Sequence, residues 1–99
     1  MGDILDTTGH KIGSIDEHLK VRNAKGIEIG HVGSDHHFHN KAGEEVGKLW
    51  ADGNVYNGDT HLGKVHPDGK VYDVEGHYVG KVVGDHIEFG GAALLLLVR

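Results

Sequence analysis

Histidine is the residue type that offers this chain the most chemistry, because it fills ten of the 99 positions. Four of these residues, His31, His36, His37 and His39, lie close together in the sequence. In a strand, His37 and His39 share one face at a spacing seen in two-histidine metal sites, with Asp35 on that side as a candidate third ligand. The segment predicts either a weak divalent-metal site or a polar hairpin tip in solvent. We favour the solvated tip because the ligand set is incomplete.

A second group of polar residues follows a glycine that recurs along the chain. Its members are Ser14, His31, Lys48, Lys64 and Lys81. If the copies of the recurring segment are arranged in a ring, these residues form a largely cationic ring. A solvated face is the simpler interpretation, and binding of a small anionic ligand by Lys48, Lys64, Lys81 and His31 is the most specific binding hypothesis.

Enzyme chemistry is not predicted, because the required groups do not converge. The only serines are Ser14 and Ser34, and strand alternation points the contiguous Ser34, Asp35 and His36 to opposite faces. The adjacent carboxylates Glu44 and Glu45 also face apart. Neither a phosphate-binding loop nor a dinucleotide fingerprint is present. The sequence therefore predicts no catalytic residue and no cofactor.

Composition excludes several further classes of function. The formal net charge of -5 argues against nucleic acid as a partner. The absence of cysteine excludes disulfides and thiolate metal sites. The first residues lack the basic and apolar regions of a signal peptide, so a cytoplasmic location is predicted. The longest apolar run is far shorter than the roughly 20 residues that span a membrane. With 37% apolar and 6% aromatic residues the core is lean, which leaves room for a homo-oligomer.

An internal repeat organises most of the chain. Glycines recur at spacings of 17, 17, 16 and 17, and they are Gly13, Gly30, Gly47, Gly63 and Gly80. The repeat units cover approximately residues 6–22, 23–39, 40–55, 56–72 and 73–89. Four units open with Asp or Asn, two further residues and Gly, which is typical of a tight turn. The fourth unit has Gly58 one place early and Asp59 in the usual glycine position, which explains the shorter spacing.

Each unit is predicted to hold two short strands. Apolar residues stand directly before the recurring glycine and two positions after it, as Ile29 and Val32 do around Gly30. Alternation places the glycine and the later apolar residue on one face of the strand. The glycine therefore either faces something that leaves no room for a Cβ or marks a bulge that brings both apolar residues to one side.

A second turn and a returning strand complete each unit. The turn positions His18, Asp35, Asp52, Asp68 and Asp85 are explained by turn chemistry alone. In the last unit the returning strand is expected at Ile87-Glu-Phe89, with its apolar phase shifted by one residue. Asp3-Ile-Leu5 has the pattern of a returning strand without a partner, and we expect it to pair with the last unit and close the ring. The aromatic residues Trp50, Tyr56, Tyr72 and Phe89 are expected to pack between units rather than to form a sugar-binding platform.

The carboxy-terminal segment, residues 90–99, differs from the repeats. Gly90-Gly91 is interpreted as a flexible exit from the last unit. The run from Ala92 to Val98 contains Leu94, Leu95, Leu96 and Leu97. Ala and Leu favour a helix, but so short an apolar helix is stable only when it is buried. We therefore expect it to run through the centre of the ring, opposite the recurring glycines.

These repeats and the Gly-Gly-Ala-Ala-Leu-Leu-Leu-Leu ending resemble the bacterial β-flower proteins. The resemblance covers nearly the whole chain. It implies an all-β fold in which short hairpin petals surround a carboxy-terminal apolar segment. That family has no assigned activity, so the expected role is a non-catalytic structural or interaction module.

Overall fold

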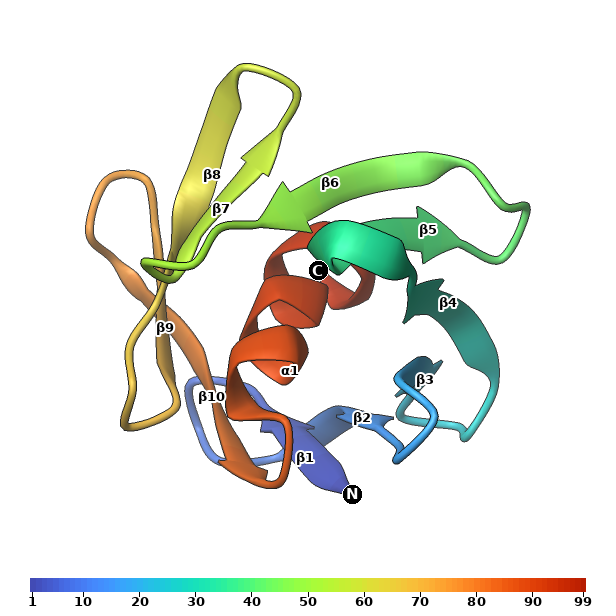
Figure 1. Cartoon of the computed structure of the whole chain (residues 1–99). Coiled ribbons are helices and arrows are strands. Elements are labelled where there is room, and N and C mark those ends of the chain that lie inside the picture. Colours follow the sequence, from blue (N-terminus) through green and yellow to red (C-terminus); the bar gives the residue numbers. More distant parts are fainter.

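The computed structural model describes residues 1–99 as a closed barrel of ten antiparallel strands with a helix inside it (Figure 1). The strands are β1 (Gly2–Leu5), β2 (Lys11–Ile15), β3 (Lys20–Asn23), β4 (Glu28–Val32), β5 (His37–Asn40), β6 (Glu45–Leu49), β7 (Asn54–Asn57), β8 (Thr60–Val65), β9 (Lys70–Asp73) and β10 (Tyr78–Gly84). The helices are the one-turn η1 (Ser34–His36), the α-helix α1 (Ile87–Ala93) and its π-helical continuation η2 (Leu94–Val98). None of these helices has the length and apolar character that crossing a membrane requires.

Closure of the sheet depends on the first strand. Each strand pairs with its sequence neighbours, and β1 also pairs with β10, with Ile4 opposite Val82. The predicted pairing of Asp3-Ile-Leu5 with the last repeat is thereby confirmed. The returning strand expected at Ile87-Glu-Phe89 is wrong, because these residues begin α1. Strand β1 occupies the edge of β10 that such a strand would have used.

Turns built on Asp or Asn close the hairpins at their outer ends. In the β3–β4 hairpin, Asn23 Oδ1 accepts hydrogen bonds from the backbone N–H groups of Lys25 at 2.9 Å and Ile27 at 3.1 Å. Gly26 completes the turn with φ of +80°, a conformation that glycine adopts at little cost. The β7–β8 hairpin is shorter, because Asn57 pairs directly with Thr60 across a two-residue turn. This difference accounts for the single spacing of 16 in the repeat.

Every one of these hairpins contains a β-bulge directly before the recurring glycine. In β3–β4, Val21 pairs with Gly30 and Arg22 with Glu28, which leaves Ile29 as the extra residue. The equivalent extra residues are Ile12, Val46, Leu62 and Val79. All are partly buried, and all except Leu62 pack against the core. The bulge thus brings the apolar residue before the glycine to the same side as the one after it.

The same glycines also face the carboxy-terminal helix. A Cβ added to Gly47 would lie 2.5 Å from Leu96 Cδ2, and one added to Gly30 would lie 2.7 Å from Leu97 Cδ1. The five pairs run in reverse order along the chain: Gly80 with Leu94, Gly63 with Leu95, Gly47 with Leu96, Gly30 with Leu97, and Gly13 with Val98. Both structural roles considered for the glycine are therefore present at once.

The π-helical winding of η2 fits this one-to-one pairing. Five positions around a closed sheet are separated by about 72°, whereas consecutive α-helical residues are separated by about 100°. A π-helix is wound more widely, with i→i+5 hydrogen bonds, so each residue advances by a smaller angle. The backbone N–H of Arg99 donates to the carbonyl of Leu94 at 3.2 Å, which is such a bond. Consecutive η2 side chains can therefore meet consecutive glycines.

The core consists of side chains from the sheet and the helix. The strands contribute Ile4, Ile15, Val21, Val32, Phe38, Leu49, Val55, Val65, Val71 and Val82. Helix residues Ala92, Ala93 and Leu94 are fully buried among them.

The interpretation of Gly90-Gly91 as a flexible exit is wrong: both glycines are buried within α1, and a Cβ on Gly91 would lie 2.5 Å from a Val65 methyl group. Their small size lets the helix approach the strands.

Candidate functional site

Three open clefts lie beside the turns that join one hairpin to the next or lead into the helix. The first, of about 410 Å³, is called the Trp50 cleft and is lined by Asp35, His36, His37, Lys48, Leu49, Trp50 and Ala51. It is formed by η1 and the start of β5 on one side and by the end of β6 with its following turn on the other. Two neighbouring repeats therefore supply its walls.

The Trp50 cleft differs from the other two in its chemistry. The second cleft, of about 480 Å³, contains the carboxylates Asp85 and Glu88 and no Lys or Arg. The third, of about 380 Å³, contains Asp16 and Glu17 beside Arg22. The Trp50 cleft instead combines an amine, two imidazoles and an indole with a single carboxylate. It alone combines an indole wall with a lysine amine.

Aromatic contacts hold the indole wall in place. The Trp50 ring packs against Tyr56, with ring centroids 4.8 Å apart, and Tyr56 in turn stacks on His61 at 4.8 Å. Trp50 nevertheless keeps 49% of its surface exposed. Such aromatic pairs contribute about 0.5–1.5 kcal/mol each beyond burial of their area. The indole is therefore held by contact with Tyr56 while about half of its surface remains accessible.

The opposite wall is fixed from the helix. His36 packs edge-on against Phe89 of α1 at 5.2 Å, and Phe89 packs against the buried Phe38 at 6.4 Å. Asp35 and His36 both adopt left-handed φ values, 56° and 64°. Non-glycine residues rarely adopt this conformation without support from surrounding contacts. The contact of His36 with Phe89 provides that support.

His37 lies on the wall of the cleft next to a carboxylate. Its Nδ1 atom is 2.8 Å from Glu45 Oε1 and is shielded from solvent. The angles at the ring do not meet those of a hydrogen bond, so this contact is an ion pair when the imidazole is protonated. Across the β5–β6 ladder His37 stands opposite Lys48. The cleft wall can thus hold two adjacent positive charges, one of them balanced by Glu45.

Two charged groups of the cleft, the carboxylate of Asp35 and the amine of Lys48, have no hydrogen-bond or ion-pair partner. For Asp35 this differs from the equivalent aspartates in the next two repeats. Asp52 and Asp68 accept hydrogen bonds from the backbone N–H groups of Asn54 and Lys70, both at 3.0 Å. The bond from Asn54 lowers the pKa of the Asp52 carboxyl below its ordinary value. Turn chemistry therefore explains these two aspartates, as predicted. The carboxylate of Asp35 makes no such bond, because its turn is the strained η1.

Lys48 is the second charged group without a partner, since no carboxylate lies within ion-pair distance of its Nζ. The only Lys and Arg side chains in ion pairs are Lys11, 3.2 Å from Asp3, and Arg22, 3.6 Å from Asp16. Lys48 therefore differs from Lys64 and Lys81 by lining a cleft, and not by lacking a partner. Asp35 and Lys48 are thus both available to a ligand between the two walls.

The structure does not bring the proposed metal ligands Asp35, His37 and His39 together at one point. No three His, Asp or Glu side chains in the chain are grouped so that they could hold one metal ion. His37 contacts Glu45, whereas His39 stacks on His31 across the β4–β5 ladder, with ring centroids 5.2 Å apart. Asp35 and His37 lie together in the Trp50 cleft, away from this histidine pair.

The residues of the proposed cationic ring are also separated. His31, Lys48, Lys64 and Lys81 lie on β4, β6, β8 and β10, and another strand stands between each of these. Each is flanked by the buried glycine and the buried apolar residue of its strand, so it projects outward from the sheet. Only Lys48 lines a cleft.

The spacing of the repeats in the sequence indicates which turns lie beside each other at the Trp50 cleft. The turns at 33–36 and 50–53 occupy equivalent positions in adjacent repeats, 17 residues apart. Neighbouring repeats in a closed sheet place such turns side by side. The repeat spacing could therefore have placed Asp35 near Trp50, although it does not indicate the conformation of η1.

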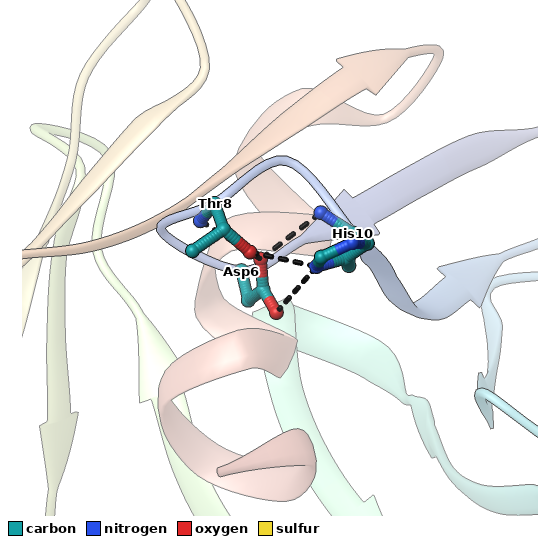
Figure 2. A network of polar contacts seen from close by, with 3 residues as sticks. All are labelled: Asp6, Thr8 and His10. Carbon is teal, nitrogen blue, oxygen red and sulfur yellow. Dashed lines mark hydrogen bonds and ion pairs between the residues drawn. The ribbon is translucent and has the colours of Figure 1, made fainter.

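A polar network at the first hairpin tip has the residue types of a catalytic triad but not its setting. Figure 2 shows Asp6, Thr8 and His10 turned toward one another. Thr8 Oγ1 lies 2.7 Å from both Asp6 Oδ1 and His10 Nδ1, and the backbone N–H of His10 donates to Asp6 at 3.0 Å. The His10 side chain is 82% exposed, and none of the three clefts reaches this turn. The network stabilises the turn.

Comparisons with protein-family models, curated proteins and solved structures find no match for this chain.

Proposed function

We propose that this chain is a non-catalytic binding module that holds a small anionic ligand in the Trp50 cleft. The observation that carries the proposal is the presence of Asp35 and Lys48, both without a protein partner, beside the supported and exposed indole of Trp50. A cleft of about 410 Å³ lies within the range of small-molecule sites.

The scaffold for this module is, in our proposal, a β-flower of five hairpin petals around the carboxy-terminal helix. The pairing of one helix residue with one glycine supports it, because each petal then contributes the same small-residue contact to the centre. Each junction between petals brings two turns together, and sequence variation there can change a cleft without altering the core.

The Trp50 cleft contains no hydroxyl or thiol nucleophile, which supports a binding role there rather than catalysis. Neither serine hydroxyl is hydrogen-bonded to a histidine, and Ser14 is only 7% exposed. The histidine nearest a carboxylate in the cleft, His37, has Glu45 as that neighbour and no hydroxyl or thiol beside it. A nucleophile needs an adjacent base that is itself oriented by a third group.

Intrinsic fluorescence provides a direct test, because Trp50 is the only tryptophan in the chain. We expect a saturable change in its emission with at least one of acetate, benzoate, phosphate and glucuronate. The change should be lost in Lys48→Gln and retained in Lys64→Gln, which alters the equivalent position one repeat later, outside the cleft. No response to any of the four anions would refute the proposal, and so would equal losses in the two variants.

Binding of a divalent metal by the His31–His39 pair is a second candidate. The two rings stack across neighbouring strands at 5.2 Å with an interplanar angle of 19°, and two cross-strand imidazoles can chelate one ion. We expect zinc or nickel to give calorimetric heat that disappears in His31→Ala and persists in His77→Ala, which changes an exposed tip histidine. Binding tighter than micromolar would favour this function, whereas no heat would exclude it.

A further inference from the structure

We propose that the ligand of the Trp50 cleft is an acidic sugar, a pyranose ring that carries one carboxylate. This inference rests on the proposed function and adds the chemical class of the ligand. Three features of the cleft each fit one part of such a molecule. They are the indole of Trp50, the unpaired carboxylate of Asp35, and the neighbouring side chains of Lys48 and His37.

Trp50 selects the ring. Its ring is flat, apolar and about half exposed at the cleft, and it packs against Tyr56. The C–H face of a pyranose is a flat apolar surface of matching size, and it can pack on an indole while its hydroxyls stay at the edge. A small inorganic anion would leave this face unused.

Asp35 selects the hydroxyl groups. An ionised carboxylate only accepts hydrogen bonds, and that of Asp35 accepts none from the protein. Adjacent sugar hydroxyls can donate two bonds to it. Benzoate has no hydroxyl and a hydrogen phosphate dianion has only one, so neither can donate two hydrogen bonds to Asp35.

Lys48 and His37 select the carboxylate of the ligand. They stand opposite each other on β6 and β5, and Lys48 has no acidic partner. Glu45 balances His37 when that ring is protonated, so the amine of Lys48 is the one cation on this wall without an acidic partner. One carboxylate matches this charge. A neutral sugar leaves Lys48 unpaired, and the chain's net charge of -5 further disfavours a dianion.

The experiment compares glucuronate, glucose, benzoate and phosphate by titrating Trp50 fluorescence in the full chain. We expect glucuronate to bind tightest, with glucose and benzoate each at least tenfold weaker. Asp35→Asn should weaken glucuronate severalfold and leave benzoate unchanged or tighter. Asp68→Asn, which alters the equivalent aspartate two repeats later, is the matched control and should leave both affinities unchanged.

The possible results separate this inference from the proposed function. Benzoate or phosphate could bind more tightly than glucuronate and lose that binding in Lys48→Gln. This result would refute an acidic sugar as the ligand but would support binding of a small anion in the Trp50 cleft. If glucose binds as tightly as glucuronate, the carboxylate of the ligand makes no contribution to binding, and this part of the inference is refuted. An Asp35→Asn variant that weakens benzoate and glucuronate equally would refute the role of the hydroxyls. No binding by any of the four probes would refute the acidic sugar, and if acetate also failed to bind, the binding module would be refuted as well.

Discussion

Gly47 and Leu96 approach so closely that a Cβ added to the glycine would lie 2.5 Å from Leu96 Cδ2. On its other side the same Cβ would lie 2.6 Å from the backbone oxygen of Tyr56. Gly47→Ala must therefore displace both the helix and a strand. We expect it to lower the free energy of unfolding by about 1–3 kcal/mol, measured by urea denaturation.

Gly13 provides the matched comparison, because its nearest helix atom is more distant. A Cβ there would lie 3.3 Å from Val98 Cγ2 and 2.8 Å from the Arg22 carbonyl oxygen. Gly13→Ala should consequently destabilise the protein less than Gly47→Ala. Equal losses would show that contact with the strand, rather than with the helix, sets the cost.

Leu94 is the one residue of η2 that is fully buried. We expect Leu94→Ala to cost about 2–5 kcal/mol of stability, and Leu97→Ala, at a half-buried position, to cost clearly less. Leu94→Asp should prevent folding, because an unpaired carboxylate would be buried. Circular dichroism and urea denaturation measure these effects, and a cooperatively folded Leu94→Asp protein would contradict the central position of the helix.

Deletion of residues 92–99 removes the whole central contact. We expect an insoluble or molten chain, because thin hairpins are marginally stable in water without an apolar partner. Dye binding to exposed apolar surface, together with loss of near-ultraviolet circular dichroism, would report this state. A soluble, monomeric and cooperatively folded truncated chain would show instead that the segment is an appendage.

Acid should destabilise the hairpin turns in a way that can be traced to two aspartates. Hydrogen bonding by the Thr8 hydroxyl lowers the pKa of the Asp6 carboxyl below its ordinary 3.8, and bonding by the His77 and Glu75 backbone N–H groups does the same to the pKa of Asp73. Because each pKa is lower in the folded state, the stabilisation is present above about pH 4 and is lost as the pH falls through the folded value.

The repeat itself provides the substitution that tests this pH dependence. Asn23 and Asn40 form the same turn without a titrating group. Asp6→Asn with Asp73→Asn should therefore retain the fold and reduce the fall in melting temperature between about pH 5 and pH 2.5. Asp59→Asn changes a carboxylate in the two-residue turn that accepts no hydrogen bond, and it should leave the pH profile unchanged.

Support of the indole by Tyr56 can be measured without a ligand. Tyr56→Leu removes the ring behind Trp50, so we expect greater quenching of Trp50 fluorescence by acrylamide and a weaker response to glucuronate. Tyr72→Leu makes the same change one repeat later, where His66 replaces the indole, and it should affect neither. Identical quenching in the wild type and Tyr56→Leu would show that the cleft wall needs no support.

The closed all-β fold with a carboxy-terminal helix was predicted correctly because its signals are local and repeated. The spacing of the glycines located the bulges, and the unpartnered pattern of Asp3-Ile-Leu5 predicted the pairing with β10. Gly90-Gly91 was misinterpreted because a glycine pair resembles a flexible linker in the sequence. The crowding by Val65 and Val82 that requires these glycines comes from distant strands.

The candidate site was predicted only in part, because it joins residues of two repeats. Asp35 and His37 were selected as metal ligands and Lys48 as part of an anion ring, but their proximity arises from the turns at 33–36 and 50–53. The stacking of His39 on His31 was not predicted, because His31 was assigned to the anion-binding ring and His39 to the metal ligands. The position of Trp50 in a cleft depends on the strained η1 turn, which its sequence does not indicate.

The pairing of η2 with glycines from Gly13 to Gly80 also sets the order in which the protein can form. The first hairpin to be synthesised meets its helix contact only after Val98 has been added, and β1 meets β10 only after Val82. Contacts of such large sequence separation slow folding, because the chain must lose entropy before they form. During synthesis on the ribosome the hairpins therefore lack their contacts with the helix until the residues of η2 have been added.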